Sequence, residues 1–219
     1  MADRARPLSW PTAVGPTVAL AGPPALAGIS QRLVGGGGLA VEFWLQVTLC
    51  AIGAFVLFVV VRLERLPLGT IGVRRPASST IVAAFALYAL AFVLVPLVIR
   101  PLVAAVGQPG ADAGVARIRT WPVWFRVFVA MTSGAVEETL YRGYAVERLV
   151  ALTGRQWVAA TLAIAAFAAA HIPFWGAEFA LTADLAAGVV LVLFYLWRRE
   201  LLANILAHSA ALLVQLMAV

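Results

Sequence analysis

The sequence predicts an all-α protein, a polytopic bundle of about six transmembrane helices. The chain has 219 residues, of which 63% are hydrophobic and only 12% are charged. An ordinary soluble domain carries about 25% charged residues. This composition excludes a disordered chain, and a single cysteine, Cys50, excludes a fold held by intramolecular disulfides.

The net charge of +6 would suit a nucleic-acid-binding protein if the basic residues were gathered on one face. They are instead spread thinly between long apolar stretches. We therefore expect the lipid bilayer as the surroundings of the chain and no nucleic acid as a partner.

Residues 1–41 are expected to form an irregular lead-in. Their apolar stretch contains three prolines, Pro16, Pro23 and Pro24. Each interior proline costs a helix about 3 kcal/mol, so we interpret this stretch as irregular or interfacial, with a broken seventh helix as the alternative. The prolines and the lack of a small-residue cleavage site argue against a signal peptide. Residues 42–219 are expected to form one transmembrane domain.

Five stretches in this domain reach or approach the about 20 residues that a membrane helix needs. They are 43–61, 79–99, 157–174, 179–197 and 201–219. A sixth stretch, 123–149, begins apolar and then runs into several charged residues. Placing a carboxylate at membrane depth costs free energy, and such residues usually mark a functional site. This stretch is therefore the one that indicates function.

The arginines predict the orientation of the bundle. With six spans, the loops 62–78, 148–156 and 198–200 share one side and carry eight arginines, against six on the other side. The positive-inside rule then places the 62–78 loop in the cytoplasm. We expect an integral protein of a bacterial plasma membrane.

Polar residues inside the expected spans are the candidate functional groups. Both histidines of the chain, His171 and His208, lie in spans, where titratable residues usually face a cavity. Glu138 and Arg142 are four residues apart on a helix, so they can pair. Glu137 points about 100° away from Glu138 and has no local cation.

Helix lengths indicate that three of these groups can meet. At 1.5 Å per residue, Glu137, His171 and His208 lie about 17, 21 and 11 Å from the cytoplasmic ends of their helices, and they can share a layer once helix tilt is allowed for. A carboxylate and two imidazoles supply a base for water and donors for an oxyanion. Zinc is the competing chemistry, since one Glu and two His match a catalytic zinc site. No His-Glu-x-x-His helix is present, so we favour a site without metal.

At these residues the chain resembles the CPBP family, the Abi or type II CaaX prenyl endopeptidase group of intramembrane proteases. The motif Glu-Glu-x-x-x-Arg stands as Glu137, Glu138 and Arg142, the motif Phe-x-x-x-His as Phe167 and His171, and the histidine of the third motif as His208. The resemblance covers roughly residues 62–215 and identifies 42–219 as a transmembrane helical protease domain.

The resemblance implies hydrolysis of a peptide bond in a membrane-associated protein or peptide. Glu137 would activate water, His171 would hold that water, and His208 would donate to the oxyanion. Glu138 and Arg142 would shape the site. The family was formerly described as metalloproteases, but the mechanism inferred for its better-understood members depends on glutamate and implies no cofactor.

One position departs from the family pattern. An asparagine usually follows the third-motif histidine by four residues, and this chain has Leu212 there. Asn204 is the candidate substitute for the missing oxyanion donor, because it lies one turn before His208 on the same face.

Two other functions stay open. A proton-coupled transporter would use intramembrane acids such as Asp184, which is otherwise expected to be a structural partner of an arginine or a backbone amide. No internal repeat supports a transporter. A non-catalytic membrane partner of the same fold would tolerate Leu212, but the joint presence of Glu137, His171 and His208 argues against it. No substrate-reading motif is visible, so prenylated CaaX peptides, bacteriocin leaders and small membrane proteins are all open as substrates.

Overall fold

The computed structural model describes residues 10–34, 38–94, 117–177 and 180–218, together with positions 97, 101, 104 and 105. Regular structure within these residues is entirely helical, which confirms the all-α class. Three helical segments are long and apolar enough to cross a membrane: Leu39–Leu63, Gln156–Phe174 and Ala180–Arg198. Shorter apolar helices occupy Val14–Ile29, Ser78–Val93 and Leu201–Met217. The protein is an integral membrane protein.

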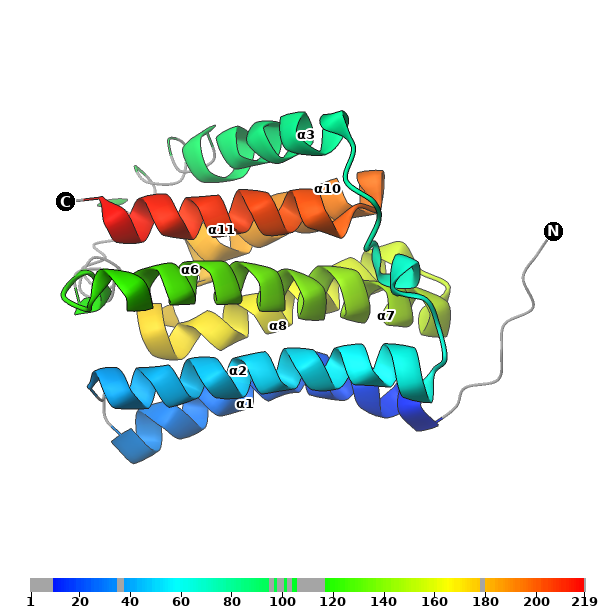
Figure 1. Ribbon diagram of the computed structural model, residues 1–219, viewed down its shortest axis with the longest axis horizontal. Coiled ribbons are helices and arrows are strands. Elements are labelled where there is room, and N and C mark those ends of the chain that lie inside the picture. The colour runs from blue at the N-terminus through cyan, green and yellow to red at the C-terminus, as the bar shows by residue number, and fades with distance from the viewer. Residues whose placement is uncertain are drawn as a thin grey trace.

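The helices lie side by side along one direction (Figure 1). In chain order they are α1 (Trp10–Val34), α2 (Leu39–Phe58), η1 (Val59–Leu63), η2 (Leu68–Ile71), α3 (Ser78–Tyr88), η3 (Ala89–Leu94), α6 (Val123–Glu137), η4 (Glu138–Val146), α7 (Glu147–Thr153), α8 (Gln156–Trp175), η5 (Ala180–Asp184), α10 (Leu185–Arg198) and α11 (Leu201–Met217). The α6 helix packs against α2 and α11, and α8 packs against α1 and α10. The far end of the expected span 79–99 lies outside the described residues.

The N-terminal segment differs from the expected irregular lead-in. The α1 helix is continuous through its three prolines. Pro16 and Pro23 are buried, and α1 packs on α2 and α8. Most helix stability in proteins comes from the packing of a helix face, and here that packing offsets the backbone hydrogen bonds that the prolines lack. The division of the chain at residue 42 stays a prediction.

The charged sixth span is one helical rod in which the geometry changes at the two glutamates. The α6 helix ends at Glu137, and the π-helical η4 begins at Glu138. All nine residues of η4 are buried. Wide π-helical turns inside α-helices occur frequently at functional sites. π-helical segments also occur at η1, η3 and η5, so this geometry accompanies the glutamate pair and does not by itself identify a site.

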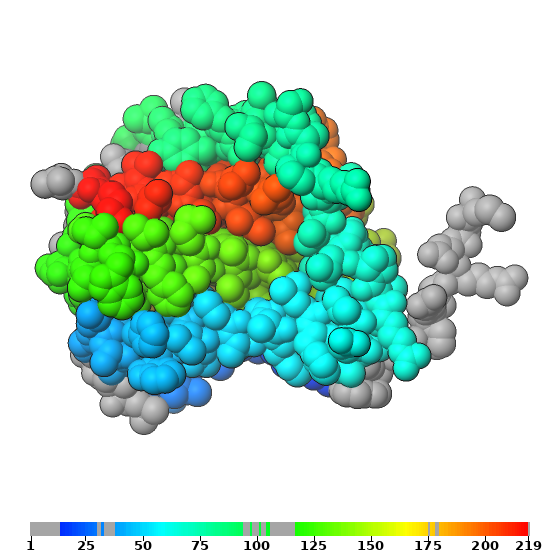
Figure 2. Space-filling view, viewed as in Figure 1, coloured from blue at the N-terminus to red at the C-terminus, as the bar shows by residue number. Residues whose placement is uncertain are grey.

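The loop 64–77 closes one end of the bundle, at the right in Figures 1 and 2, where it lies beside the start of α11. We call this end the loop end. Glu64 forms an ion pair of 2.7 Å with Arg148 and accepts a hydrogen bond of 3.0 Å from the Tyr144 hydroxyl. The Gly72 carbonyl accepts a bond of 2.8 Å from the backbone N–H of Leu201. These contacts fix the loop to η4, α7 and α11.

A second anchor at the loop end is Glu200, between α10 and α11. The Thr80 hydroxyl of α3 donates to one carboxylate oxygen, and the Arg198 guanidinium bonds the other at 2.7 Å. Burial alone would raise the pKa of the Glu200 carboxyl, but the bonds from Thr80 and Arg198 hold that pKa below its usual value. The ionised carboxylate thus joins α3 to the α10–α11 turn.

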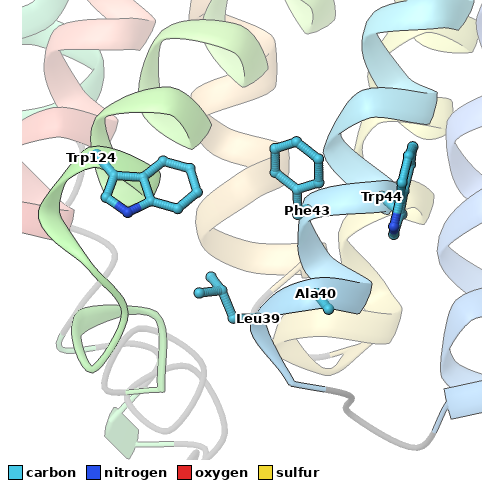
Figure 3. Close-up of a pocket in the computed structure, with 5 residues that line it drawn as sticks. All are labelled: Leu39, Ala40, Phe43, Trp44 and Trp124. Atoms are coloured by element: carbon cyan, nitrogen blue, oxygen red, sulfur yellow. The ribbon is translucent and has the colours of Figure 1, made fainter.

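The opposite end carries an apolar hollow between α2 and α6 (Figure 3), lined by Leu39, Ala40, Phe43, Trp44 and Trp124. Phe43 points toward Trp124, with ring centroids 6.5 Å apart. Trp44 and Trp124 are exposed, as is common for tryptophans at a membrane–water interface. The hollow lies about 20 Å along α6 from Glu137, so it is separate from the candidate site.

Candidate active site

The structure brings together the six residues that the sequence singled out. Glu137, Glu138 and Arg142 come from the α6–η4 rod, His171 from α8, and Asn204 and His208 from α11. Both α8 and α11 pack against η4. The residues divide into a buried cluster around Glu138 and a more open pair formed by Glu137 and His171.

Glu138 is the centre of the buried cluster. Its Oε1 accepts hydrogen bonds from Arg142 Nη1 at 3.0 Å and from His208 Nδ1 at 2.9 Å. Its Oε2 accepts a bond of 3.2 Å from Asn204 Nδ2. The Glu138 and Arg142 side chains are 0% exposed. A carboxylate that accepts three hydrogen bonds in the interior acts as a structural anchor for the helices that supply the donors.

Arg142 is held by the ion pair with Glu138 and by an aromatic ring. Its guanidinium carbon lies 4.2 Å from the centroid of the Phe167 ring, a close cation–π contact. A Cβ added at Gly188 of α10 would lie 3.7 Å from Arg142 Nη2, so α10 approaches the guanidinium closely. The motif phenylalanine therefore covers the buried cation, and its ring also packs against those of His171 and His208, with centroids 4.5 and 6.1 Å apart.

Glu137 and His171 form the open pair. His171 Nε2 lies 3.8 Å from Glu137 Oε2, and the two side chains are 17% and 13% exposed. His171 Nδ1 is 2.8 Å from the Phe167 carbonyl. A carbonyl only accepts, so Nδ1 carries a proton and the neutral ring presents a lone pair on Nε2. Among the described residues, Glu137 Oε2 is buried and has no hydrogen-bond partner.

The spacing of this pair suits a bridging molecule. At 3.8 Å the two atoms are too far apart for a direct hydrogen bond. A water molecule between them could bond to both, because each of its hydrogen bonds needs about 2.8 Å. The Glu137–His171 pair can therefore hold and deprotonate a water.

His208 belongs to the buried cluster and also stacks on an aromatic ring of η3. Its Nδ1 bonds Glu138, and its ring stacks on Phe92 of η3 with centroids 5.8 Å apart. Nε2, on the other side of the ring, is the atom that can meet a substrate. Phe92 was not singled out by the sequence, since it lies in a uniformly apolar run with no polar neighbour to mark it.

Asn204 corrects one interpretation. Its Nδ2 donates to Glu138 Oε2 and, at 2.9 Å, to the Leu191 carbonyl, so both amide protons are used. Turning the amide would place its oxygen against two acceptors, which fixes the orientation. Asn204 is therefore not free to act as the substitute oxyanion donor. It lies on the same face as His208, as expected, but that face also meets Glu138.

Gly134 is a site-supporting residue that sequence reasoning missed. A Cβ at Gly134 would lie 2.3 Å from Ser209 Oγ, 2.8 Å from its backbone nitrogen and 2.9 Å from its Cα. The α6 and α11 helices thus cross in contact, one turn from Glu138 and one residue from His208. Small residues commonly occupy such crossings in membrane helices. The small pairs Ser133-Gly134 and Ser209-Ala210 in two expected helices could therefore have indicated a close helix crossing.

A comparison with models of protein families found one that matches part of the chain. The model described as type II CAAX prenyl endopeptidase Rce1-like matches residues 119–214. This part of the chain is similar to the Rce1-like family. The Rce1-like region runs from the start of α6 into α11 and contains all six candidate residues. Comparisons with curated proteins and with solved structures gave no match.

The family is one of CAAX-type proteases, so the Rce1-like region supports a hydrolase with a peptide or protein substrate in the membrane. A metal-dependent version of that chemistry would need converging ligands. Across the described part of the chain, no group of three or more His, Cys, Asp or Glu residues is arranged to hold a metal ion. His208 presents Nδ1 to Glu138, whose carboxylate is already paired with Arg142.

Proposed function

We propose that this protein is an intramembrane endopeptidase that hydrolyses a peptide bond in a membrane-associated protein or peptide, with water activated by Glu137. The observation that supports it best is the unpaired Glu137 Oε2 at 3.8 Å from His171 Nε2. The Rce1-like family match supports the protease class. We further propose a bacterial plasma membrane as the location, with the 62–78 loop cytoplasmic.

The reaction follows from the hydrogen bonds of the pair. Glu137 takes a proton from the bridging water while the water oxygen attacks the peptide carbonyl carbon. Because His171 donates from Nδ1 to Phe167, its Nε2 accepts from the water and orients it. The carbonyl oxygen becomes an oxyanion, the C–N bond then breaks, and Glu137 returns the proton to the leaving nitrogen. Overall, water and the peptide become a carboxylic acid and an amine.

The oxyanion needs a donor, and His208 is the side chain placed to supply it. His208 already donates from Nδ1 to Glu138, so donation from Nε2 requires the imidazolium form. The ion pair with Glu138 stabilises that form. Asn204 contributes indirectly, by holding Glu138 in place.

Leu212 lies one turn past His208 on the same face and cannot donate. An added donor should speed the reaction, since losing one from an oxyanion hole costs about 10² to 10³ in rate. Leu212→Asn is therefore expected to accelerate cleavage of a reporter peptide. A rate unchanged in a folded Leu212→Asn protein would mean that the oxyanion forms away from this face of α11.

We propose that no metal or other cofactor takes part. The expected result is that cleavage by detergent-purified protein is unchanged after exhaustive treatment with a zinc chelator. Loss of cleavage, restored by added zinc, would refute a metal-free reaction.

The two glutamates provide the main test. Glu137→Gln should abolish cleavage with normal yield of folded protein, because it removes the base without breaking any side-chain hydrogen bond among the described residues. Glu138→Gln should also lower the folded yield, because it leaves Arg142 as an unpaired buried charge at a cost of about 3 to 5 kcal/mol. Equal activity losses with normal folding of both variants would contradict this division. A folded wild type that cleaves no membrane peptide would favour the non-catalytic membrane partner.

A further inference from the structure

Asp184 is an acidic residue of the bundle interior that the proposed reaction does not use. It is the last residue of η5, directly before α10. Its Oδ2 is buried and has no hydrogen-bond partner within the described residues. Its carboxylate lies within electrostatic reach of His171, Glu137 and His208. The groups of the proposed reaction are thus its titratable neighbours.

The α10 helix places Asp184 on the wall of the site. Gly188 and Leu191, four and seven residues later, share a helix face with Asp184. Gly188 adjoins the Phe167 ring and Arg142 Nη2, and the Leu191 carbonyl accepts the bond from Asn204. That face is therefore turned toward the Glu138 cluster, and Asp184 extends it by one turn away from the loop end.

Helix depth agrees with this placement. Asp184 is about 21 Å from the loop end of α10, and His171 is about 22 Å from the loop end of α8. The two helices pack against each other, and η5 packs against α8. Asp184 and His171 therefore lie at one level of the bundle, beside Glu137.

The charges at this level are not balanced by the protein. The expected arginine or backbone amide partner of Asp184 Oδ2 is not found in the described structure. The guanidinium of Arg142, which adjoins Gly188 one turn along α10, is paired with Glu138 and covered by Phe167. Glu137 and Asp184 thus place two carboxylates around His171, while the second imidazole within reach, that of His208, is paired with Glu138. Acidic groups at membrane depth ordinarily pair with a positive group or line a substrate path.

We propose that Asp184 determines substrate specificity by binding the cationic side chain of a lysine or arginine adjacent to the scissile bond. This inference rests on the proposed peptidase function and names the substrate class of that site. The substrate cation supplies the positive charge that this level of the bundle lacks, and its salt bridge with Asp184 holds the scissile carbonyl beside Glu137. A neutral residue at that position leaves Asp184 unpaired.

Binding without turnover tests the inference directly. Membrane peptides that differ only in lysine, norleucine or glutamate next to the cleavage position are titrated into detergent-solubilised Glu137→Gln protein. We expect the lysine peptide to bind about 30-fold or more tighter than the norleucine peptide, as for a desolvated charge pair. Adding Asp184→Asn should remove this preference. Glu147→Gln, which changes a carboxylate at the loop end, is the matched control and should keep it.

Cleavage by wild type, measured in parallel, separates this inference from the peptidase proposal. Cleavage without a lysine preference in either assay refutes the role of Asp184 and leaves the peptidase standing. A lysine preference that disappears with Asp184→Asn, in a protein that cleaves nothing, supports the binding role and refutes the peptidase. If Asp184→Asn weakens binding of all three peptides equally, or no peptide binds, the specificity role is overturned. A uniform fall in kcat with a shifted pH profile would instead identify Asp184 as a positioning residue for His171.

Discussion

Substituting Gly134 by alanine should uncouple the two helices that carry the Glu138 cluster. The new Cβ would meet Ser209 at 2.3 Å from Oγ, 2.8 Å from N and 2.9 Å from Cα. The hydroxyl can rotate away, but the backbone nitrogen and Cα cannot. The clash can therefore be relieved only if α6 and α11 move apart.

The size of the movement follows from these distances. Carbon atoms pack best at about 3.5 to 4.0 Å, so the helices must separate by about 1 Å at the crossing. The Glu138–His208 bond of 2.9 Å lies one turn away and would then exceed hydrogen-bond range. Overpacking of this kind costs about 1 to 3 kcal/mol of stability. A displacement of about 1 Å in a site can cost about 10²-fold in rate.

Thermal unfolding in detergent and cleavage of a reporter peptide measure the two effects. Gly28→Ala is the matched control, because Gly28 is also helical and nothing lies within 4 Å of its added Cβ. That variant should be at least as stable as wild type, since alanine favours a helix over glycine by about 1 kcal/mol. Ser209→Ala should not rescue Gly134→Ala, because it removes the hydroxyl and leaves the backbone clash. A Gly134→Ala protein with wild-type Tm and activity would refute this account of the helix crossing.

Three further outcomes are expected. Glu64→Gln leaves the buried Arg148 without its charge partner and should lower the free energy of unfolding by about 3 kcal/mol; an unchanged Tm in detergent would contradict it. Ser78→Cys in a Cys50→Ser background should resist an impermeant thiol reagent in intact cells, because the exposed Ser78 belongs to the loop end that the positive-inside rule predicts to be cytoplasmic; labelling would invert the topology. The pKa of Glu200 is lowered by its bonds to the neighbouring hydroxyl and guanidinium, so its stabilisation is full above the unfolded-state pKa and is lost as pH falls through the lower folded-state value. The Glu200→Gln protein should accordingly lose less stability than wild type on acidification, and parallel stability curves would argue against that contribution.

Features set by local rules could be predicted from the sequence. The apolar lengths predicted the helical bundle, because one bilayer thickness fixes the length of every span. The pairing of Glu138 with Arg142, and the separate direction of Glu137, followed from the helical repeat alone. The meeting of His171 with Glu137 followed from helix depth. None of these inferences required knowledge of which helices are neighbours.

Features set by neighbouring helices could not be predicted in the same way. The prolines were expected to break α1 because the sequence does not show the packing of α1 on α2 and α8, which offsets their destabilising effect. Asn204 was placed on the correct face, but its two acceptors come from other elements, η4 and α10. The importance of Gly134 depends on which residue of α11 lies opposite it. In each case the decisive contact joins residues far apart in the chain.

The two adjacent glutamates explain why a site with so many donors can still contain a base. Arg142, His208 and Asn204 all direct their donors at Glu138. Hydrogen bonds to a carboxylate stabilise its charged form and weaken it as a base, so the same donors around Glu137 would oppose proton abstraction. By engaging these donors, Glu138 keeps them from its neighbour, and the turn of about 100° between successive helical residues directs the two side chains toward different partners. For Glu138 to act as the base and Glu137 as the structural anchor, all three donors would have to move. The proposed base is therefore Glu137 and not Glu138.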